Sequence, residues 1–389
     1  MKSNIRFVNA FMAFYIIHTS QIGMGILGVP RIVYLESKKD AWISILLSGL
    51  FVSLITWLMI SILKKNEGGT LFEIHEHIFG RLIGSIFNFL IVIYFIAVHY
   101  SITISYVELS LTWGYEGVYE WFGVLALLIL TIYAVSGGFR VVTGVCFLSF
   151  LLTIWLLFVM YQPLQTINLT RILPIMTTTP SEIMKGVFKS SYTMLGFETL
   201  FFIFPFIKEK NKLQLFSQIA VWFTTILVLI TTVVSILFFS AKELEKNVWP
   251  VVSMISTVHF PFIERFEFVA VPLWILVIFP NLCITLYISS MGIKQIFHIK
   301  QKYGIWLISI IPFICSFLIT KRVDNNYFFD QIGKIGFFLW FIYPIFLYGI
   351  TIIKSKINTR SRSPAVICQV PKSKELEIVS QPIPKKDNT

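Results

Sequence analysis

The residue with the clearest chemical implication is an acidic one inside a long apolar run, Glu198 in SYTMLGFETLFFIFP (191–205). It lies about nine residues from either end of a membrane span predicted at 187–207, and so roughly 13 Å from each surface. A carboxylate at that depth is expensive, so it must be protonated, paired or exposed to a water-filled cavity. Glu198 is therefore a candidate for a ligand or proton site. The alternative is a neutral Glu that forms a hydrogen bond to a neighbouring helix.

Two of the apolar runs are interrupted. The first carries Gly23, Gly25 and Gly28 before a proline in IGMGILGVPR (22–31), and the second carries Gly196 and a later proline around Glu198. Unwinding a span frees backbone N–H and C=O groups, which must then find partners inside the membrane. Half-helix N-termini suit a carboxylate, whereas unwound carbonyls suit an ammonium group or a cation, and amino acids carry both charges. The alternative is that these glycines only allow close helix packing.

Further polar residues fall at the depth of the interruptions. The run His18 to Gln21 precedes the first one, His99 lies near the middle of the predicted third span, and Asn281 follows Pro280 in the predicted eighth span. Each alone is more typical of a hydrogen bond between helices. With Glu198 they predict a cavity and the following ligand-binding set: Gln21, Gly23, Gly25, Gly28, His99, Gly196, Phe197, Glu198 and Asn281.

Signals for catalysis or for metal binding are weak. The sequence has no nucleophile elbow, phosphate-binding glycine loop or zinc-protease spacing, so we expect no enzyme and no cofactor. His75 and His77 stand beside Glu73 and Glu76, but no third ligand is in sight. We therefore expect a solvated helix face there and no metal site. Glu108 falls at the outer end of its span and can reach the interface, so it is left out of the site.

Composition identifies the class of protein. The chain has 389 residues, of which 56% are hydrophobic and only 13% charged, so a water-soluble fold is excluded. The apolar runs are long and unbroken, which argues against a membrane β-barrel. The net charge of +12 arises from basic residues in nearly every connection. It favours orientation in the membrane and contact with anionic lipid headgroups, and we expect no nucleic-acid partner.

Hydropathy predicts an all-α polytopic membrane protein with ten transmembrane helices. Lys and Arg favour both termini in the cytoplasm, chiefly because of the C-terminal tail. Cutting the chain between the fifth and sixth spans gives two halves of five, each opening with a broken span, which is the plan of an inverted repeat. We expect a membrane domain at 1–353, with repeats at about 7–162 and 187–353, and a polar, disordered tail at 354–389. The predicted spans are 7–35, 41–63, 82–111, 121–136, 139–162, 187–207, 216–240, 267–292, 304–320 and 334–353.

Four stretches resemble a known family. They are IGMGILGVPR (22–31), LGFETLFFIFPFI (195–207), WPVVSMISTVHFPFIERFEF (249–268) and IFHIKQKYGIWL (296–307). Together they resemble the permease-like B subunit of bacterial spore germinant receptors, over nearly the whole membrane portion. The stretch at 249–268 is the most specific. The larger group is the amino acid, polyamine and organocation superfamily, and the resemblance implies its fold of five plus five helices with helices 1 and 6 broken.

The resemblance also implies a function. It would make the chain a nutrient-sensing subunit in the inner membrane of a dormant spore, acting with an A subunit and a lipoprotein C subunit. A small-molecule germinant, expected to be an amino acid, would bind between Gly23–Gly28 and Gly196–Glu198. Glu198 itself departs from many transporters of the superfamily, which lack an acid at this turn. A proton-coupled amino acid permease using the same site is the alternative function.

Overall fold

The computed structural model describes residues 7–66, 68–114, 119–261, 263, 265–318 and 322–361. Contacts divide the chain into two compact units, residues 1–351 and 352–389. The described residues are helical or irregular, apart from two isolated bridges, Val8–Ile207 and Phe260–Ile263. Most of the tail predicted to be disordered, residues 362–389, lies outside the described residues.

The helices of the first half include the first broken span and the longest helix of the chain. The α4 helix begins with a capping box, in which the Thr70 hydroxyl and the Glu73 carboxylate each accept the other residue's backbone N–H. The elements are α1 (Met12–Gln21), α2 (Gly25–Ser37), η1 (Lys38–Asp40), α3 (Ala41–Lys65), α4 (Leu71–Phe79), α5 (Arg81–Trp113), α6 (Glu120–Ser136), α7 (Phe139–Thr153), α8 (Leu156–Val159), α9 (Tyr161–Leu164) and η2 (Leu169–Ile172).

The second half opens with a helix whose start is also capped. Thr179 and Glu182 form the capping box of α10, with Pro180 in the first turn. Hydrogen bonds from the Thr179 hydroxyl and N–H lower the pKa of the Glu182 carboxyl. The elements are α10 (Pro180–Ser191), η3 (Phe197–Thr199), α11 (Leu200–Ile203), η4 (Phe204–Phe206), α12 (Lys210–Phe238), α13 (Ala241–Lys246), α14 (Pro250–Ile255), α15 (Glu267–Leu273), α16 (Ile275–Phe297), α17 (Gln301–Leu318), α18 (Arg322–Phe337), the π-helical η5 (Phe338–Ile342) and α19 (Tyr343–Ser361).

Seven helical stretches of the described residues are long and apolar enough to cross a membrane. Two further apolar helices, Glu120–Ser136 and Phe197–Phe206, are shorter. The chain is thus an integral membrane protein made of helices. The seven stretches are Gly25–Lys65, Arg81–Trp113, Phe139–Leu164, Lys210–Phe238, Glu267–Phe297, Gln301–Leu318 and Arg322–Lys354.

The two spans predicted to be interrupted are divided: the first (7–35) into α1 and α2, and the sixth (187–207) into α10 and the short helices from η3 to η4. The predicted fifth (139–162) and eighth (267–292) spans are also divided, into α7, α8 and α9 and into α15 and α16. The last helical stretch begins at Arg322, well before the predicted residue 334. Its first turns are polar, but they stay helical because Asn325 accepts a hydrogen bond from the Tyr100 hydroxyl at 3.1 Å and Asp330 pairs with Lys189. A prediction from hydropathy alone assigns such polar turns to the loop between two spans.

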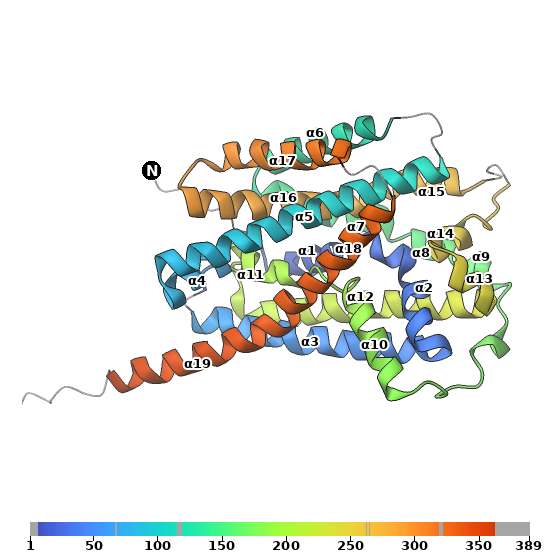
Figure 1. Ribbon diagram of the computed structural model, residues 1–389, viewed down its shortest axis with the longest axis horizontal. Helices are drawn as coiled ribbons and strands as arrows, with labels where there is room; N and C mark the ends of the chain where they lie inside the picture. Colours follow the sequence, from blue (N-terminus) through green and yellow to red (C-terminus); the bar gives the residue numbers. More distant parts are fainter. Residues whose placement is uncertain are drawn as a thin grey trace, which may run out of the picture. The chain divides into compact units, whose positions relative to one another are not determined.

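The first broken span lies inside the helix bundle. Helix α1 packs against α7, α12 and α16. The most extensive contacts between helices are those of α5 with α16 and of α3 with α12 (Figure 1). Helix α10 packs on α2 and α3, so one half of the first broken span lies beside one half of the second. Helix α18 crosses α5 in the same unit (Figure 1). The two interruptions therefore meet in the interior.

Candidate functional site

The first interruption separates α1, which ends at Gln21, from α2, which begins at Gly25. The break deprives the Thr19 and Ile22 carbonyls of their usual helical partners four residues on. The Asn281 side chain of α16 supplies both, since its Nδ2 donates to the Thr19 oxygen at 2.8 Å and to the Ile22 oxygen at 2.9 Å. A side-chain amide from another helix thus caps this break.

The second interruption lies between α10 and η3, where residues 192–196 form turns. Gly196 has φ +124°, and its N–H donates to Glu198 Oε2 at 2.6 Å. The carbonyl of Met194 accepts from Gln21 Nε2 at 2.8 Å. The Glu198 carboxylate is 4% exposed and has no ion-pair partner among the described residues. Its carboxyl group therefore has no countercharge in the described part of the chain.

The two breaks touch through their glycines. A Cβ added at Gly196 would lie 2.3 Å from the Ser20 oxygen and 2.6 Å from the Gln21 nitrogen, closer than atoms can approach. A Cβ at Gly25 would lie 3.0 Å from both Cγ2 and Oγ1 of Thr193. Gly196 therefore needs glycine, because the backbone of the first broken span passes directly over it, whereas at Gly25 a larger residue would crowd the Thr193 side chain.

A cavity of about 810 Å³ opens between the breaks, large enough for a small organic molecule. Seven of the nine residues predicted from the sequence line it: Gln21, Gly23, Gly25, Gly28, Gly196, Glu198 and Asn281. Within the described part of the chain, the buried Oε1 of Gln21 has no hydrogen-bond partner. Because Gln21 lines the cavity, this oxygen is a ready acceptor for an N–H or O–H group.

The other two predicted residues lie outside the cavity lining. His99 is buried, and its Nδ1 lies 2.9 Å from the hydroxyl of Thr285, which does line the cavity. Phe197 is buried against the ring of Phe341. His18 of the polar run bonds through Nδ1 to the Thr224 hydroxyl at 2.8 Å. The two histidines therefore form hydrogen bonds to side chains of neighbouring helices, and Phe197 packs against another ring.

Charged residues line the outer part of the cavity. Lys189 and Asp330 pair at 3.0 Å, and Arg322 and Glu108 pair at 2.7 Å. Glu108, which the sequence places at the end of its span and outside the site, lines the cavity as a half-buried carboxylate. Its partner lies 214 positions further along the chain, and no local pattern signals such a pair. Arg31 also lines the cavity and donates to the Glu245 carbonyl at 2.7 Å.

The predicted solvated face of α4 is confirmed for Glu73 and His77, which are exposed, and is wrong for His75. His75 is fully buried, with Nδ1 2.8 Å from Asn88 Oδ1 and Nε2 2.7 Å from the Tyr343 hydroxyl. The polar residues beside His75 on α4 suggest a solvated position, but contacts with α5 and α19 bury the ring. Among the described residues, no three His, Cys, Asp or Glu side chains are grouped so as to hold a metal ion.

Comparison with known proteins adds the family. The family described as spore germination protein matches residues 7–325, most of the chain. The chain belongs to the spore germination protein family. It is 35% identical to spore germination protein GerQB of Bacillus cereus over 351 residues, covering 90% of this chain and 97% of that protein. It is 25% identical to spore germination protein A2 of Bacillus subtilis (strain 168) over 357 residues, covering 91% and 98%. The resemblance seen in the sequence is confirmed.

The fold of this spore germination protein resembles that of a transporter. A solved structure of a Na+-coupled sialic acid symporter, in a substrate-bound outward-open state, matches with a TM-score of 0.64 at 13% identity. The match covers 89% of this chain and 78% of the symporter chain. At this identity the likeness concerns the fold alone. The family member is thus a helical membrane protein with a permease-like architecture.

Proposed function

We propose that this protein is the germinant-sensing membrane subunit of a spore germination receptor, and that it binds an amino acid in the cavity between its two broken spans. The observation that carries the proposal is the meeting of two capped breaks around one cavity that also exposes an unpaired acid, Glu198. Its relatives are spore germination proteins, which favours sensing over metabolism and a binding over a catalytic role.

The cavity suits a zwitterion. Glu198 and the unpartnered Oε1 of Gln21 present acceptors to an ammonium group. The start of α2 at Gly25 presents backbone N–H groups and the positive end of a half-helix to a carboxylate. A receptor requires only that the ligand binds one conformation better than another; a tenfold difference, about 1.4 kcal/mol, already shifts the balance.

The architecture we propose has ten spans in two inverted halves of five, because both halves open with a broken helix and the fold resembles a symporter. Both termini would lie on the spore-core side of the inner membrane, where the basic tail can meet anionic lipids. An A subunit and a lipoprotein C subunit would transmit the signal. These partners are inferred from the family resemblance.

Binding is tested with purified protein and two substitutions of Glu198. Thermal midpoints measured with each common amino acid, nucleosides and sugars should rise for one amino acid or a few. Glu198→Gln should keep the fold and lose this shift, because the amide cannot supply a negative charge. Glu198→Ala should lose the shift and also some stability, since it leaves a cavity. A ligand-induced shift in Glu198→Gln as large as that of the wild type would show that binding does not need a negative charge at residue 198.

A proton-coupled permease remains the second function because the fold resembles a symporter. The two functions differ in turnover, since a transporter must release its ligand on the far side in every cycle. Liposomes containing this protein alone should bind the amino acid without accumulating it. Saturable, gradient-driven accumulation would favour the permease.

A further inference from the structure

The amide group of Asn281 has an unusual task. Both hydrogens of its single Nδ2 are used on backbone carbonyls of another span, those of Thr19 at 2.8 Å and Ile22 at 2.9 Å. These are carbonyls that the first break has released from helical bonding. Asn281 is 6% exposed and lines the cavity.

The position of Asn281 on α16 is itself fixed. Pro280, the residue before it, has no N–H to offer the Leu276 carbonyl four residues back. The Ser149 hydroxyl from α7 donates to that carbonyl instead. On the other side, the Thr285 hydroxyl donates to the carbonyl of Asn281 at 2.8 Å. Hydrogen bonds on both sides of Asn281 thus fix the segment of α16 that carries its amide group.

Carbonyls released at the end of a half-helix carry partial negative charge, and in transporters with broken helices such carbonyls coordinate Na+. The symporter with the similar fold is described as Na+-coupled. The donor set here does not fit a cation in the same place, because Thr19 and Ile22 already accept amide hydrogens. A cation there would face the positive end of the Asn281 dipole.

We propose that the Asn281 amide acts as a built-in substitute for a cation at the first break, so that the broken span keeps its shape without a bound metal ion. Asn281 is then a positioning residue, which holds the backbone that borders the cavity. The proposal deepens the function proposed above, since it describes how that binding site is assembled. Its test uses the protein without any ligand, and so a failure of ligand binding would be seen separately.

The test compares wild type with Asn281→Asp and Asn281→Leu as full-length protein in detergent. Thermal midpoints are measured in NaCl and in choline chloride at equal ionic strength. The wild-type midpoint should be the same in both salts. Asn281→Asp replaces the donor with a carboxylate facing two carbonyls, so it should melt lower in choline chloride and recover by at least about 3 °C, saturably, with Na+. Asn281→Leu should melt lower in both salts.

A matched control introduces the same acid elsewhere. Asn88 on α5 is fully buried, and its Nδ2 donates at 3.0 Å to the carbonyl of Phe72 in α4; neither helix is broken at these residues. Asn88→Asp should be destabilised in both salts without rescue by Na+. The proposal is overturned by a saturable Na+ shift in wild type, by wild-type midpoints in both Asn281 variants, by no rescue of Asn281→Asp, or by equal rescue of Asn88→Asp.

Discussion

The two broken spans solve the same problem in different ways. At the first break none of the residues between α1 and α2 needs a left-handed backbone, and the carbonyls are capped from outside by Asn281 of α16. At the second break Gly196 has φ +124°, and the Met194 carbonyl is capped by Gln21, which belongs to the first break. The conformation of the second break therefore depends on the first. A substitution that distorts the first break should also destabilise the second.

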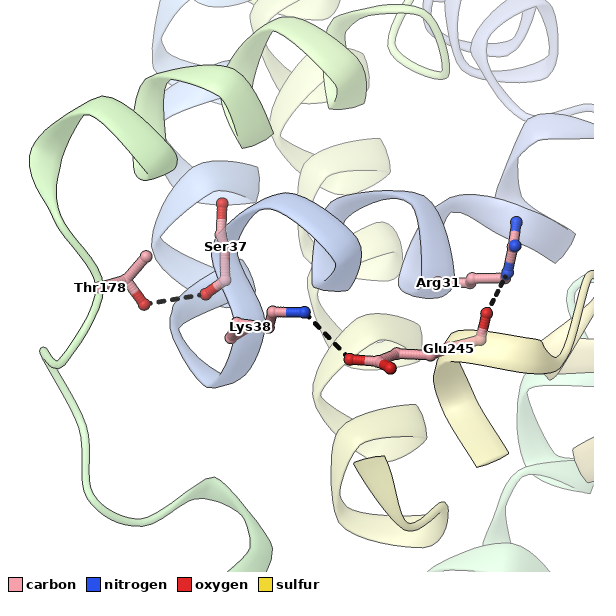
Figure 2. A network of polar contacts seen from close by, with 5 residues as sticks. All are labelled: Arg31, Ser37, Lys38, Thr178 and Glu245. Atoms are coloured by element: carbon pink, nitrogen blue, oxygen red, sulfur yellow. Dashed lines mark hydrogen bonds and ion pairs between the residues drawn. The ribbon is translucent and has the colours of Figure 1, made fainter. Parts of the chain in front are cut away.

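Side-chain contacts also hold α2 and the start of α10 (Figure 2). The carbonyl of Glu245 in α13 accepts from Arg31 Nε of α2 at 2.7 Å, and its carboxylate pairs with Lys38 of η1 at 3.0 Å. The Thr178 hydroxyl, just before α10, donates to the Ser37 carbonyl at 3.0 Å. The Lys38 pair is solvent-exposed and contributes little. The anchors therefore link the start of α10 to the end of α2, and α2 to α13.

The largest effect is expected from Gly196→Ala, which attacks the second break. Its φ of +124° disfavours any L side chain, and the new Cβ would lie 2.3 Å from the Ser20 backbone oxygen, which cannot rotate away. Strain and clash together should cost at least about 3 kcal/mol. The thermal midpoint and the amount of protein in spore membranes should both fall sharply.

A second glycine provides the control for this substitution. Gly144 lies in α7, and a Cβ there would meet nothing within 4 Å. Gly144→Ala should change stability by less than about 1 kcal/mol. If Gly196→Ala behaved like Gly144→Ala, the strained turn would have no role in holding the second break.

The next effect is expected from Gly25→Val, at the contact between the breaks. The added side chain would enter the space of Thr193, whose Cγ2 and Oγ1 lie 3.0 Å from the Cβ position. Protein should remain in the membrane, but ligand response should fall at least about tenfold, since α2 or the turn must shift. Thr193→Ala removes both atoms and should restore part of the response. A coupling energy of about 0.5–3 kcal/mol in the double-mutant cycle would show direct contact. If the effects of the two substitutions were strictly additive, Gly25 and Thr193 would not interact and the two breaks would be independent.

The sequence predicts where the breaks lie but not how they are held. Clustered glycines mark the first break, and a glycine beside an acid marks the second, because helix interruption and intramembrane charge are local properties. The caps are long-range contacts: Asn281 reaches a carbonyl 262 positions away and Gln21 one 173 positions away. Which residues face each other depends on helix packing, which a single sequence does not reveal. For the same reason the sequence does not predict the pairing of Glu108 with Arg322, the burial of His75 or the helical first turns of α18.

A moderate effect is expected from Gln21→Leu, which removes the link that makes the second break depend on the first. The Met194 carbonyl would lose its donor in a buried place, at a cost of about 1–3 kcal/mol. The ligand would also lose the free Oε1, so ligand shifts should weaken. Gln162→Leu is the control: it breaks two exposed hydrogen bonds of the same 2.8 Å length, to the His259 carbonyl and from the His259 N–H, and should still cost less because water can replace both. Equal costs would contradict the dependence of one break on the other.

The smallest effect is expected from Gly23→Ala, in the first break itself. A Cβ there would lie 3.4 Å from Asn281 Nδ2 and 3.8 Å from Asn281 Cγ, which are ordinary contacts, and the backbone does not have positive φ. The loss of backbone freedom in the unfolded chain offsets any small crowding, so stability should change by less than about 1 kcal/mol. Thermal midpoints of Gly23→Ala and Gly196→Ala measured together test the comparison directly. Similar large losses would mean that the first break is as strained as the second. Unchanged stability with lost ligand response would instead place the ligand against the Gly23 backbone, and the first break would then be the ligand-contacting one.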